Sequence, residues 1–582
     1  MKRLFRCVPW VLVVYLMAEE YGGVPGRLLI FSFFIILARL LSVLLRAPIL
    51  ASFLAVFPLC LIHFVSRTKY RLLGSPLYFW DLKYLAGKDQ LDVLQHYLSV
   101  QGVGLLLVIL AASIGIIVSI CKRERIQFQS RYKQKATHRF LKEVGVFSLY
   151  FFLLSGAVRA LNAEAKSWGY FDRMGKRHPI SLFLWSAQSS TVTLYPKAKS
   201  LPGDRQLTSA WTHSSSHPNG RRLPHLVMIL QESLADPRIL SQQWTRETHW
   251  DPLLRPSRKN GSLEVSVFGG GTWCSEFTSL VGVPTSAFGV MGNYATYIFQ
   301  EKVKFSLVSH LRTLGYRTVA IYPGPGDFVN GERFHRSLGF DQFLDAKDQI
   351  ALHGSYWGLP DVNVYQTALK ILQEHEQKEP DRPLFLWLKT IHNHGPHDRW
   401  PKQGCHQLGA SSVANMLLKG GYDPLRECAL VDYLERVEES KKAYIQLKDR
   451  FNRPGDFTRP ISVVQFGDHQ PTFFEGLTRP GLGSIGKNEK HLTFYSFELL
   501  RSLTPAQESP PPQLMNLAYL GAYWLDWSGL PLSPFHENQV QVSQVCDGYY
   551  PVDMSSPGGT PPCLDAISAL HADWVKDRVL DL

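Results

Sequence analysis

Polar side chains that can bind a metal ion or attack a substrate follow apolar segments at four places in this chain. They are Glu232, Thr272, His394 and the adjacent pair Asp468 and His469. Two carboxylates and an imidazole offer oxygen and nitrogen ligands to a divalent ion such as Zn²⁺ or Mn²⁺. A hydroxyl bound to that ion can lose its proton near neutral pH, as metal-bound water does. These residue types therefore predict a metal site with Thr272 as a candidate nucleophile.

The sequence around Thr272 suits an anionic substrate. Glycines at positions 269–271 let the backbone approach an anion closely, and a helix that begins near Ser275 directs amide groups toward a phosphoryl oxygen. Each motif also has an ordinary interpretation: a loop for the glycines, a surface carboxylate for Glu232, and a tight turn for Asp468 and His469. Their ordered combination favours a functional site.

The elements that must position these residues can be predicted from apolar patterns. Short apolar runs predict strands at residues 225–230, 264–267, 317–322, 383–388 and 461–466. Longer patterns predict helices at residues 305–313, 361–375 and 427–451. This alternation is typical of an α/β sheet with helices packed on it. Ligands of such sheets bind beyond the carboxyl ends of the strands, where Glu232, His394 and Asp468 fall.

The first third of the chain has the composition of a membrane domain. Five apolar stretches approach or reach the roughly 20 residues that cross a hydrocarbon core. They cover residues 5–17, 28–45, 49–65, 100–121 and 144–161. The first is short and follows Lys2 and Arg3, so the apolar region of a signal peptide is its alternative interpretation.

Basic residues between the fourth and fifth stretches predict the orientation. Residues 122–142 are rich in lysine and arginine, and short basic loops stay in the cytoplasm. The fifth span then leads outward, into the periplasm or an equivalent space if the source is bacterial. We therefore expect a transmembrane domain of about five helices at 1–162, a juxtamembrane segment and linker at 163–222, and an extracytoplasmic catalytic domain at 223–582.

The net charge of +13 does not indicate a nucleic-acid partner. Much of it belongs to the basic loop and to Arg221 and Arg222, for which attraction to anionic lipid is the simpler explanation. The chain contains no zinc-finger spacing and no other nucleic-acid module. We expect a protein that works at a membrane without nucleic acid.

The eight cysteines can be grouped by predicted compartment. Three lie in or beside apolar stretches: Cys7, Cys60 and Cys121. In the part predicted to be exported, the simplest disulfide pairing joins Cys405 to Cys428 and Cys546 to Cys563. The sequence does not fix this connectivity. Cys274 is left over, and we expect a buried free thiol there.

The motifs resemble those of the membrane-anchored alkaline-phosphatase/sulfatase-like transferases, especially lipoteichoic acid synthases and the phosphoglycerol transferases that act on periplasmic glucans. The resemblance spans most of the chain, and residues 70–82 are similar to the family's stretch between spans three and four. Residues 231–233, 272–277, 389–396 and 466–469 are similar to the family's metal, nucleophile and histidine motifs. The resemblance implies an N-terminal α-helical membrane domain and an α/β alkaline-phosphatase-like sandwich with a central, mostly parallel sheet.

The resemblance also implies roles for individual residues. One divalent metal, Mn²⁺ or Zn²⁺, would be held by Glu232, Thr272, Asp468 and His469, with a phosphorylated Thr272 intermediate. His394 would bind the substrate and either donate a proton or hold a phosphoryl oxygen.

Neighbouring positions supply further candidates for substrate binding. Of His392 and His397, one would assist and the other would be structural. The synthases carry an arginine where this chain has Gly331 after Asn330. Arg333 is the candidate replacement, with an ordinary surface charge as its alternative, so Asn330, Arg333 and His397 complete the predicted substrate-binding set.

The implied reaction moves a phospholipid head group. Thr272 would attack phosphatidylglycerol or phosphatidylethanolamine, releasing diacylglycerol, and a hydroxyl of a cell-envelope glycan or polymer would then accept the head group. A hydrolase that passes the group to water is the alternative. A sulfatase is disfavoured because no modified Cys or Ser motif surrounds Thr272. The resemblance places the protein in a bacterial inner membrane, with the catalytic domain on the periplasmic or exterior side.

Overall fold

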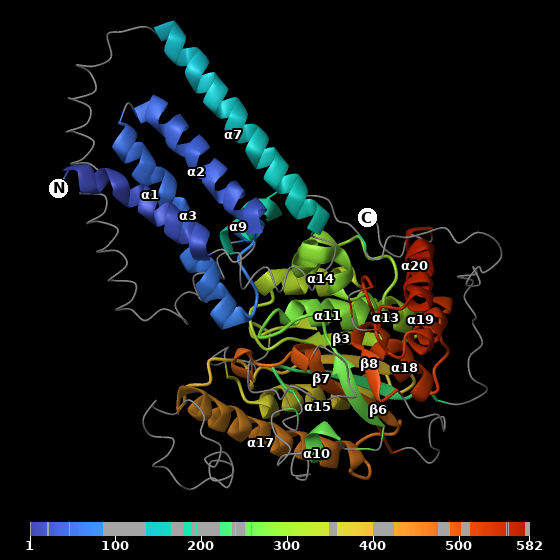
Figure 1. Cartoon of the computed structure of the whole chain (residues 1–582). Coiled ribbons are helices and arrows are strands. Elements are labelled where there is room, and N and C mark those ends of the chain that lie inside the picture. The colour runs from blue at the N-terminus through green and yellow to red at the C-terminus, as the bar shows by residue number, and fades with distance from the viewer. Residues whose placement is uncertain are drawn as a thin grey trace. The chain divides into compact units, whose positions relative to one another are not determined.

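The computed structural model of the chain (Figure 1) forms two compact units, Met1–Thr191 and Val192–Leu582. The structure describes residues 2–19, 23–45, 47–84, 136–164, 179–187, 194, 222–235, 239, 251–255, 257, 259–348, 358–399, 424–474, 489–501, 512–554, 556 and 558–576.

The first unit is helical. Its described helices are α1 (Lys2–Glu19), α2 (Gly23–Leu45), α3 (Pro48–Leu73), α4 (Asp81–Tyr84), α7 (Ala136–Glu164) and α9 (Pro179–Ser186). Among described residues, Val24–Leu45 and Pro48–Arg71 are long and apolar enough to cross a membrane. Shorter apolar stretches lie at Cys7–Glu19 and Gly145–Arg159. The predicted number of about five spans is not confirmed, because the fourth stretch, 100–121, lies outside the described residues.

The helices of the first unit bury only part of their apolar surface. Val13 of α1, Phe34 of α2 and Leu59 of α3 form the centre of a small core. Other large apolar side chains are left exposed, including Leu44 at 72% and Phe152 at 75%. An apolar exterior of this kind suits contact with lipid rather than water.

The second unit is built on a mixed sheet of eight strands in the order β4-β3-β5-β1-β6-β7-β2-β8. The strands are β1 (His225–Gln231), β2 (Asn260–Glu264), β3 (Arg317–Ile321), β4 (Gln342–Leu344), β5 (Leu384–Lys389), β6 (Ile461–Gly467), β7 (Leu492–Leu500) and β8 (Leu514–Asn516). The described pairs are parallel except where β7 meets β6 and β2. The predicted α/β class is confirmed.

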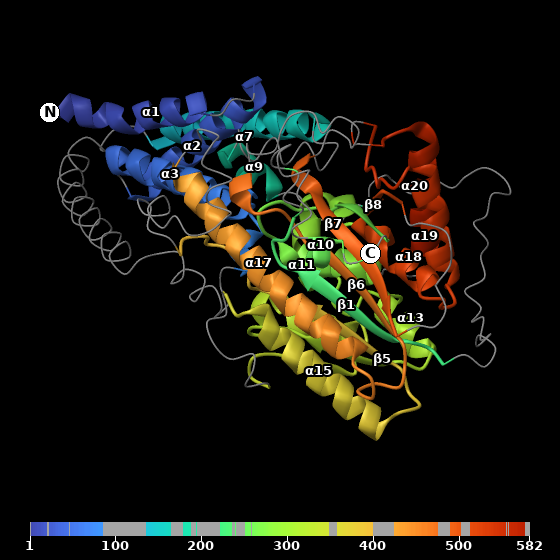
Figure 2. The same ribbon diagram turned by 90° about the horizontal axis from the view of Figure 1, so that it is seen from below.

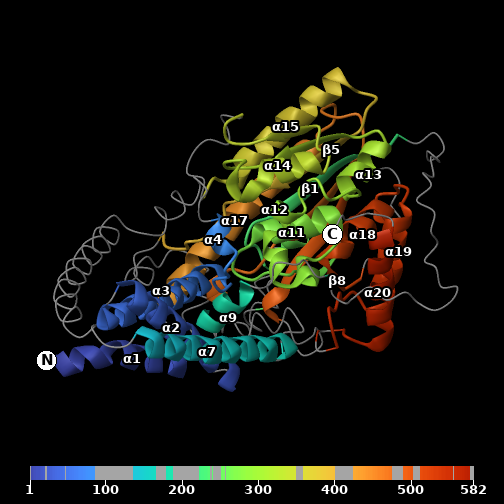
Figure 3. The same cartoon turned by 90° about the horizontal axis from the view of Figure 1, so that it is seen from above.

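Helices cover both faces of this sheet (Figure 1). One face carries α10 (Asp251–Leu254), α15 (Asp361–Lys378) and α17 (Pro424–Asn452), and Figure 2 shows α15 and α17 lying side by side. The other described helices are α11 (Thr272–Val281), α12 (Ala295–Ile298), α13 (Leu307–Thr313), α14 (Gly331–Ser337), α18 (Leu520–Trp527), α19 (Pro534–Val545) and α20 (Pro561–Lys576). Figure 3 shows α18, α19 and α20 grouped at one end of the unit. Short 3₁₀ turns complete it: η3 (Thr285–Tyr294), η4 (Phe328–Asn330), η6 (Thr472–Phe474), η7 (Glu489–His491) and η8 (Leu517–Tyr519).

Strand residues alternate between these two helical layers. Val227 and Ile229 share a core with Tyr365 of α15 and Leu434 of α17. All seven residues of β1 are buried. A nearly continuous apolar strand is what burial on both faces requires.

Some predicted boundaries were wrong. The strand predicted at 264–267 is β2, which ends at Glu264 because its pairing with β7 ends at Glu264 opposite Leu492. The helix predicted to begin near Ser275 already begins at Thr272. The sequence prediction also missed β4, β7 and β8, of which β4 and β8 are only three residues long.

The cysteines of the second unit largely match their predicted states. Cys546 and Cys563 form a disulfide with an S–S distance of 2.02 Å, which confirms that pair. Cys428 is also disulfide-bonded, but its predicted partner Cys405 lies outside the described residues. Cys274 is free and buried, and burial raises the pKa of its thiol to about 12, so the thiol is unreactive at neutral pH.

Candidate active site

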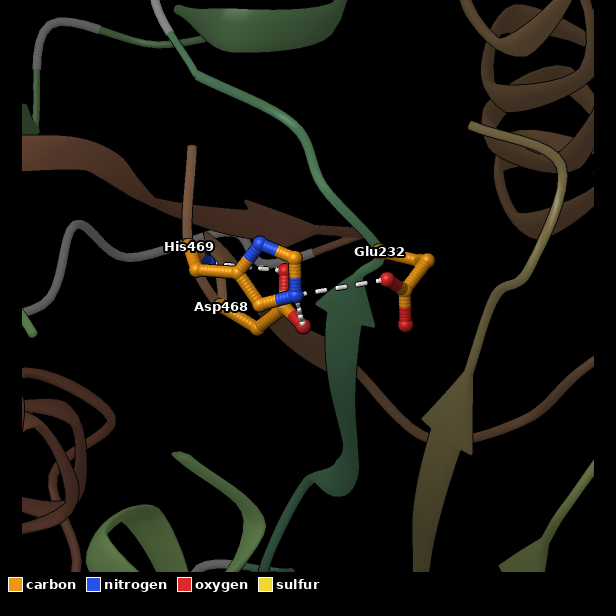
Figure 4. Close-up of side chains that lie close together, drawn as sticks. All are labelled: Glu232, Asp468 and His469. Atoms are coloured by element: carbon orange, nitrogen blue, oxygen red, sulfur yellow. Dashed lines mark hydrogen bonds and ion pairs between the residues drawn. The ribbon is translucent and has the colours of Figure 1, made fainter. Parts of the chain in front are cut away.

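Strand register places the candidate metal ligands together. In the parallel ladder, Gln231 at the end of β1 lies opposite Gly467 at the end of β6. The next residues, Glu232 and Asp468, therefore leave the same edge of the sheet side by side. Ligand atoms of Glu232, Asp468 and His469 all lie within 4.8 Å of one another. Figure 4 shows the three side chains gathered at this point.

His469 directs a lone pair at the two carboxylates. Its Nδ1 lies 3.0 Å from the carbonyl oxygen of Gln470, so Nδ1 carries the proton in the neutral ring. Nε2 then faces Glu232 Oε1 at 3.5 Å and Asp468 Oδ2 at 3.3 Å. A lone pair facing buried carboxylate oxygens is stable only with a proton or a metal ion between them.

Asp468 provides an independent sign that a cation fits here. Its Oδ1 accepts hydrogen bonds from the backbone N–H groups of Ser233, at 2.7 Å, and His469, at 2.8 Å. Its buried Oδ2 has no hydrogen-bond partner in the described part of the chain. Burial and the neighbouring Glu232 carboxylate raise the pKa of Asp468 to about 7. A divalent cation would give Oδ2 a partner and would offset the repulsion between the two buried carboxylates.

Glu232 is held in its charged form. Burial alone would raise its pKa, but His394, His469 and Lys389 together with a hydrogen bond from Ser233 hold the pKa below its ordinary value. The Ser233 hydroxyl donates to Glu232 Oε1 at 3.0 Å. A charged carboxylate is the form that binds a metal ion.

Thr272 lies next to these ligands. Its Oγ1 is 3.1 Å from Glu232 Oε2 and 3.4 Å from His469 Nε2. Thr272 is the first residue of α11, and Gly271 before it has a φ of 87°, in the left-handed region that favours glycine. Because Gly271 has no side chain to cap the helix, amides of the first turn of α11 remain suited to binding a phosphoryl oxygen.

Comparison with known proteins identifies the family of the domain that carries these residues. Residues 224–493 match the sulfatase family model. This part of the chain is a sulfatase-family domain. It contains Glu232, Thr272, Asp468 and His469, and the recognition of an alkaline-phosphatase/sulfatase-like protein from sequence is confirmed.

One relative of the chain is an uncharacterized protein of Haemophilus influenzae, which is 24% identical over 342 residues. That match covers 56% of this chain and 57% of the relative, so the chain spans little more than half of the curated protein that it matches.

Solved structures with a similar fold include two transferases. The phosphoglycerol transferase GacH of Streptococcus pyogenes, in complex with sn-glycerol-1-phosphate, has 19% identity and a TM-score of 0.46, covering 62% of this chain and 90% of its own. The lipooligosaccharide phosphoethanolamine transferase A of Neisseria meningitidis has 12% identity and a TM-score of 0.46, covering 89% and 95%.

His394 lies close enough to Glu232 and His469 for their charges to affect its pKa. Its Nδ1 is 2.6 Å from the carbonyl oxygen of Gly395, so Nδ1 carries the proton and Nε2 has the lone pair. Burial lowers the pKa of His394 to about 4, against the opposite effect of Glu232. The side chain is therefore neutral at pH 7, whereas the predicted role as a proton donor needs the protonated ring.

Other predicted substrate-binding residues have different surroundings. His397 Nε2 donates to the carbonyl of Asn393 at 3.0 Å, and its ring contacts Tyr433 and Phe473. The amide of Asn330 donates to the carbonyl of Thr296 at 2.9 Å and to Gln300. Arg333 is exposed on α14. Roles for Asn330, Arg333 and His397 in substrate binding stay predictions.

Two supporting residues of the site were missed in the sequence. Thr390 Oγ1 accepts a hydrogen bond from the backbone N–H of Glu232 at 3.0 Å. Ser275 Oγ donates to the carbonyl of Asp468 at 2.7 Å and thereby joins α11 to the end of β6. Both residues lie within motifs that the sequence analysis singled out, at residues 389–396 and 272–277. Membership of these motifs was the signal that could have identified them.

A buried ion pair behind the site was also missed. Lys389 Nζ lies 2.9 Å from Glu276 Oε1 and donates to the hydroxyl of Tyr322 at 3.1 Å. Glu276 is one helical turn after Thr272 on α11. The signal for this pair was a lysine at the end of an otherwise apolar strand.

Proposed function

We propose that this protein transfers a phosphoglycerol or phosphoethanolamine head group from a membrane phospholipid to a cell-envelope glycan or polymer. The observation that supports this most strongly is the position of the Thr272 hydroxyl, 3.1 Å from Glu232 Oε2 and 3.4 Å from His469 Nε2, at the start of a helix. A nucleophile, a metal-ligand set and an anion-binding helix end therefore meet at one point of a sulfatase-family domain.

The residues present fit one divalent metal ion. Glu232, Asp468 and His469 would hold it with Thr272, and Asp468 Oδ2, which has no hydrogen-bond partner among the described residues, supports this assignment. Oxygen and imidazole ligands suit Mn²⁺ or Zn²⁺. When bound, such an ion favours deprotonation of the Thr272 hydroxyl and attracts phosphoryl oxygens.

The chain's own groups then carry out two displacements. In the first, Thr272 Oγ1, after losing its proton to solvent, forms a bond to phosphorus while the bond from phosphorus to the diacylglycerol oxygen breaks, and that oxygen takes a proton from solvent. In the second, an acceptor hydroxyl attacks phosphorus, and the bond to Thr272 breaks. His394, which is neutral at pH 7, would take the proton of the acceptor hydroxyl as that hydroxyl attacks. The first amides of α11 would hold the phosphoryl oxygen in both steps.

The features of the first unit support a lipid donor. Its two long apolar helices and exposed apolar side chains suit a multi-pass protein of a bacterial inner membrane. The disulfide between Cys546 and Cys563 supports a catalytic domain on the oxidising, periplasmic or exterior side.

The test is an assay of the full-length protein with phosphatidylglycerol or phosphatidylethanolamine labelled in the head group. We expect diacylglycerol release with one lipid, and at least a hundredfold loss in Thr272→Val, which keeps the side-chain shape but removes the nucleophile. Thr278→Val is the matched control, because Thr278 is buried on the same helix and its hydroxyl donates to the carbonyl of Cys274. Release at the wild-type rate by Thr272→Val contradicts the proposal, and label found only as free head-group phosphate indicates a hydrolase.

A further inference from the structure

One face of α17 presents a row of polar side chains to the loop that carries His394. Asp432, Arg436, Glu439 and Ser440 follow one another at spacings of four, three and one residues, which places them on the same side of a helix. Asp432, Arg436 and Ser440 are buried. Buried polar groups on a helix need a specific partner, and here the partner is the loop at residues 392–396.

Arg436 makes the most extensive contact. Its Nη1 donates to the carbonyls of His392, at 3.1 Å, and His394, at 3.0 Å, while Nη2 donates to the carbonyl of Pro396 at 3.2 Å. Asp432 accepts from Nε at 2.9 Å and from Nη2 at 3.0 Å, which fixes the plane of the guanidinium. The planar guanidinium group thus donates hydrogen bonds to three carbonyls of the loop, on both sides of the His394 side chain.

Side chains of the loop are held by the same helix face. Asn393 Nδ2 donates to Ser440 Oγ at 3.1 Å, and Ser440 donates to Asp361 at 2.6 Å. His392 Nε2 is 2.6 Å from Glu439 Oε2. These contacts join α17 to the loop and do not involve the metal-ligand set.

From this geometry we propose that Arg436, oriented by Asp432, is a positioning residue that fixes His394 for proton transfer. The proposal rests on the proposed function, because it assumes that His394 acts on the substrate. Arg436 acts through the loop backbone and does not itself touch the reacting atoms. Displacing a catalytic group by about 1 Å can cost about a hundredfold in rate.

Arg459 offers a matched control. It is as buried as Arg436, and its guanidinium also binds backbone carbonyls, those of Pro380 at 3.1 Å and Leu223 at 3.0 Å. It precedes β6, at the opposite edge of the sheet from Asp468. Arg436→Lys and Arg459→Lys therefore disturb the same kind of contact at different distances from the site.

The experiment measures kcat and KM of head-group transfer by the full-length protein, together with the melting temperature of each variant. We expect Arg436→Lys to lower kcat by about 10- to 100-fold with little change in KM for the lipid. Arg459→Lys should retain kcat within about threefold even where its melting temperature falls equally. Added guanidinium should restore part of the activity of Arg436→Ala.

A double-mutant cycle with His394→Ala separates positioning from general destabilisation. If Arg436 works through His394, the pair His394→Ala and Arg436→Lys loses no more activity than His394→Ala alone. If the loss in the double variant equals the product of the losses in the two single variants, the inference is overturned while the proposed function stays intact. A wild-type kcat in Arg436→Lys would have the same consequence. A wild-type protein that transfers no head group from either lipid overturns both.

Discussion

At the scale of single residues, Asp468 shows how the fold prepares the site for a cation. Two backbone amides hold Oδ1, and Oδ2 faces the lone pair of His469 Nε2 at 3.3 Å. Burial and the charge of Glu232 raise the pKa of this carboxyl to about 7. In the absence of an ion, Asp468 therefore carries a proton below about pH 7.

This pKa predicts pH-dependent metal affinity. Below about pH 7, Asp468 must release a proton before it binds an ion, so affinity for Mn²⁺ should fall by up to about tenfold per pH unit as pH is lowered from 7 to 6. Above pH 7 that contribution disappears. Calorimetric titration of the full-length protein with Mn²⁺ at pH 8, 7 and 6 measures how the affinity changes with pH. Asp468→Asn should bind Mn²⁺ more weakly and should lose the part of this pH dependence that Asp468 causes. Equal affinity at all three values contradicts the prediction.

At the scale of elements, the site depends on how closely β6 passes the turn after β1. A Cβ atom added at Gly467 would lie only 1.8 Å from the carbonyl oxygen of Leu234 and 3.1 Å from Thr493. A side chain is therefore excluded at the residue just before Asp468. The glycine allows the close approach that brings Glu232 and Asp468 together.

Gly467→Ala should consequently damage both stability and the site. We expect a loss of about 1–3 kcal/mol, as for other overpacked positions, with a loss of head-group transfer. Gly521→Ala on α18 is the control, because its Cβ would meet Leu307 at an ordinary 3.6 Å. Thermal unfolding of the two variants checks this, and equal melting temperatures would show that the close approach at Gly467 is not a constraint.

How much could be predicted from the sequence differed between kinds of element. Strands β1, β5 and β6 were predictable because burial on both faces leaves an apolar run, and the polar residues after them marked the site. Arg436 could not be found in this way, because its partners are backbone carbonyls about 40 residues away and leave no pattern in the sequence. The ion pair of Lys389 and Glu276 likewise joins residues 113 positions apart in the sequence.

At the scale of the whole molecule, the edge of the sheet opposite the site contributes to acid stability. His225 Nδ1 accepts a hydrogen bond from the backbone of Leu384, so Nε2 carries the proton and donates to Glu376 at 2.8 Å. Burial lowers the pKa of His225. Burial alone would raise the pKa of Glu376, but hydrogen bonds from His225 and Thr458 lower it to about 2.

These shifts predict that the protein loses stability on acidification. A carboxylate whose pKa is lowered in the folded state stabilises it fully above the unfolded value of 4.5, and this contribution is lost as pH falls from 4.5 toward 2. Buried neutral His225 adds a loss that begins below 6.5. The melting temperature of Glu376→Gln should be lower than that of the wild type at pH 7, and the difference should shrink below pH 4.5. Glu374 is exposed on the same helix, so Glu374→Gln should have the melting temperature of the wild type at each pH. A melting-temperature difference between Glu376→Gln and the wild type that stays constant from pH 7 to 3 contradicts the linkage.

The most direct test of the central claim is detection of the covalent intermediate on Thr272. The full-length protein would be mixed with Mn²⁺ and either phosphatidylglycerol or phosphatidylethanolamine, quenched in acid and digested for mass spectrometry. We predict a head-group phosphate on the peptide that contains Thr272, present before acceptor is added, lost after it, and absent with chelator or in Thr272→Val. Diacylglycerol release with no adduct on Thr272, at an unchanged rate in Thr272→Val, would contradict the account.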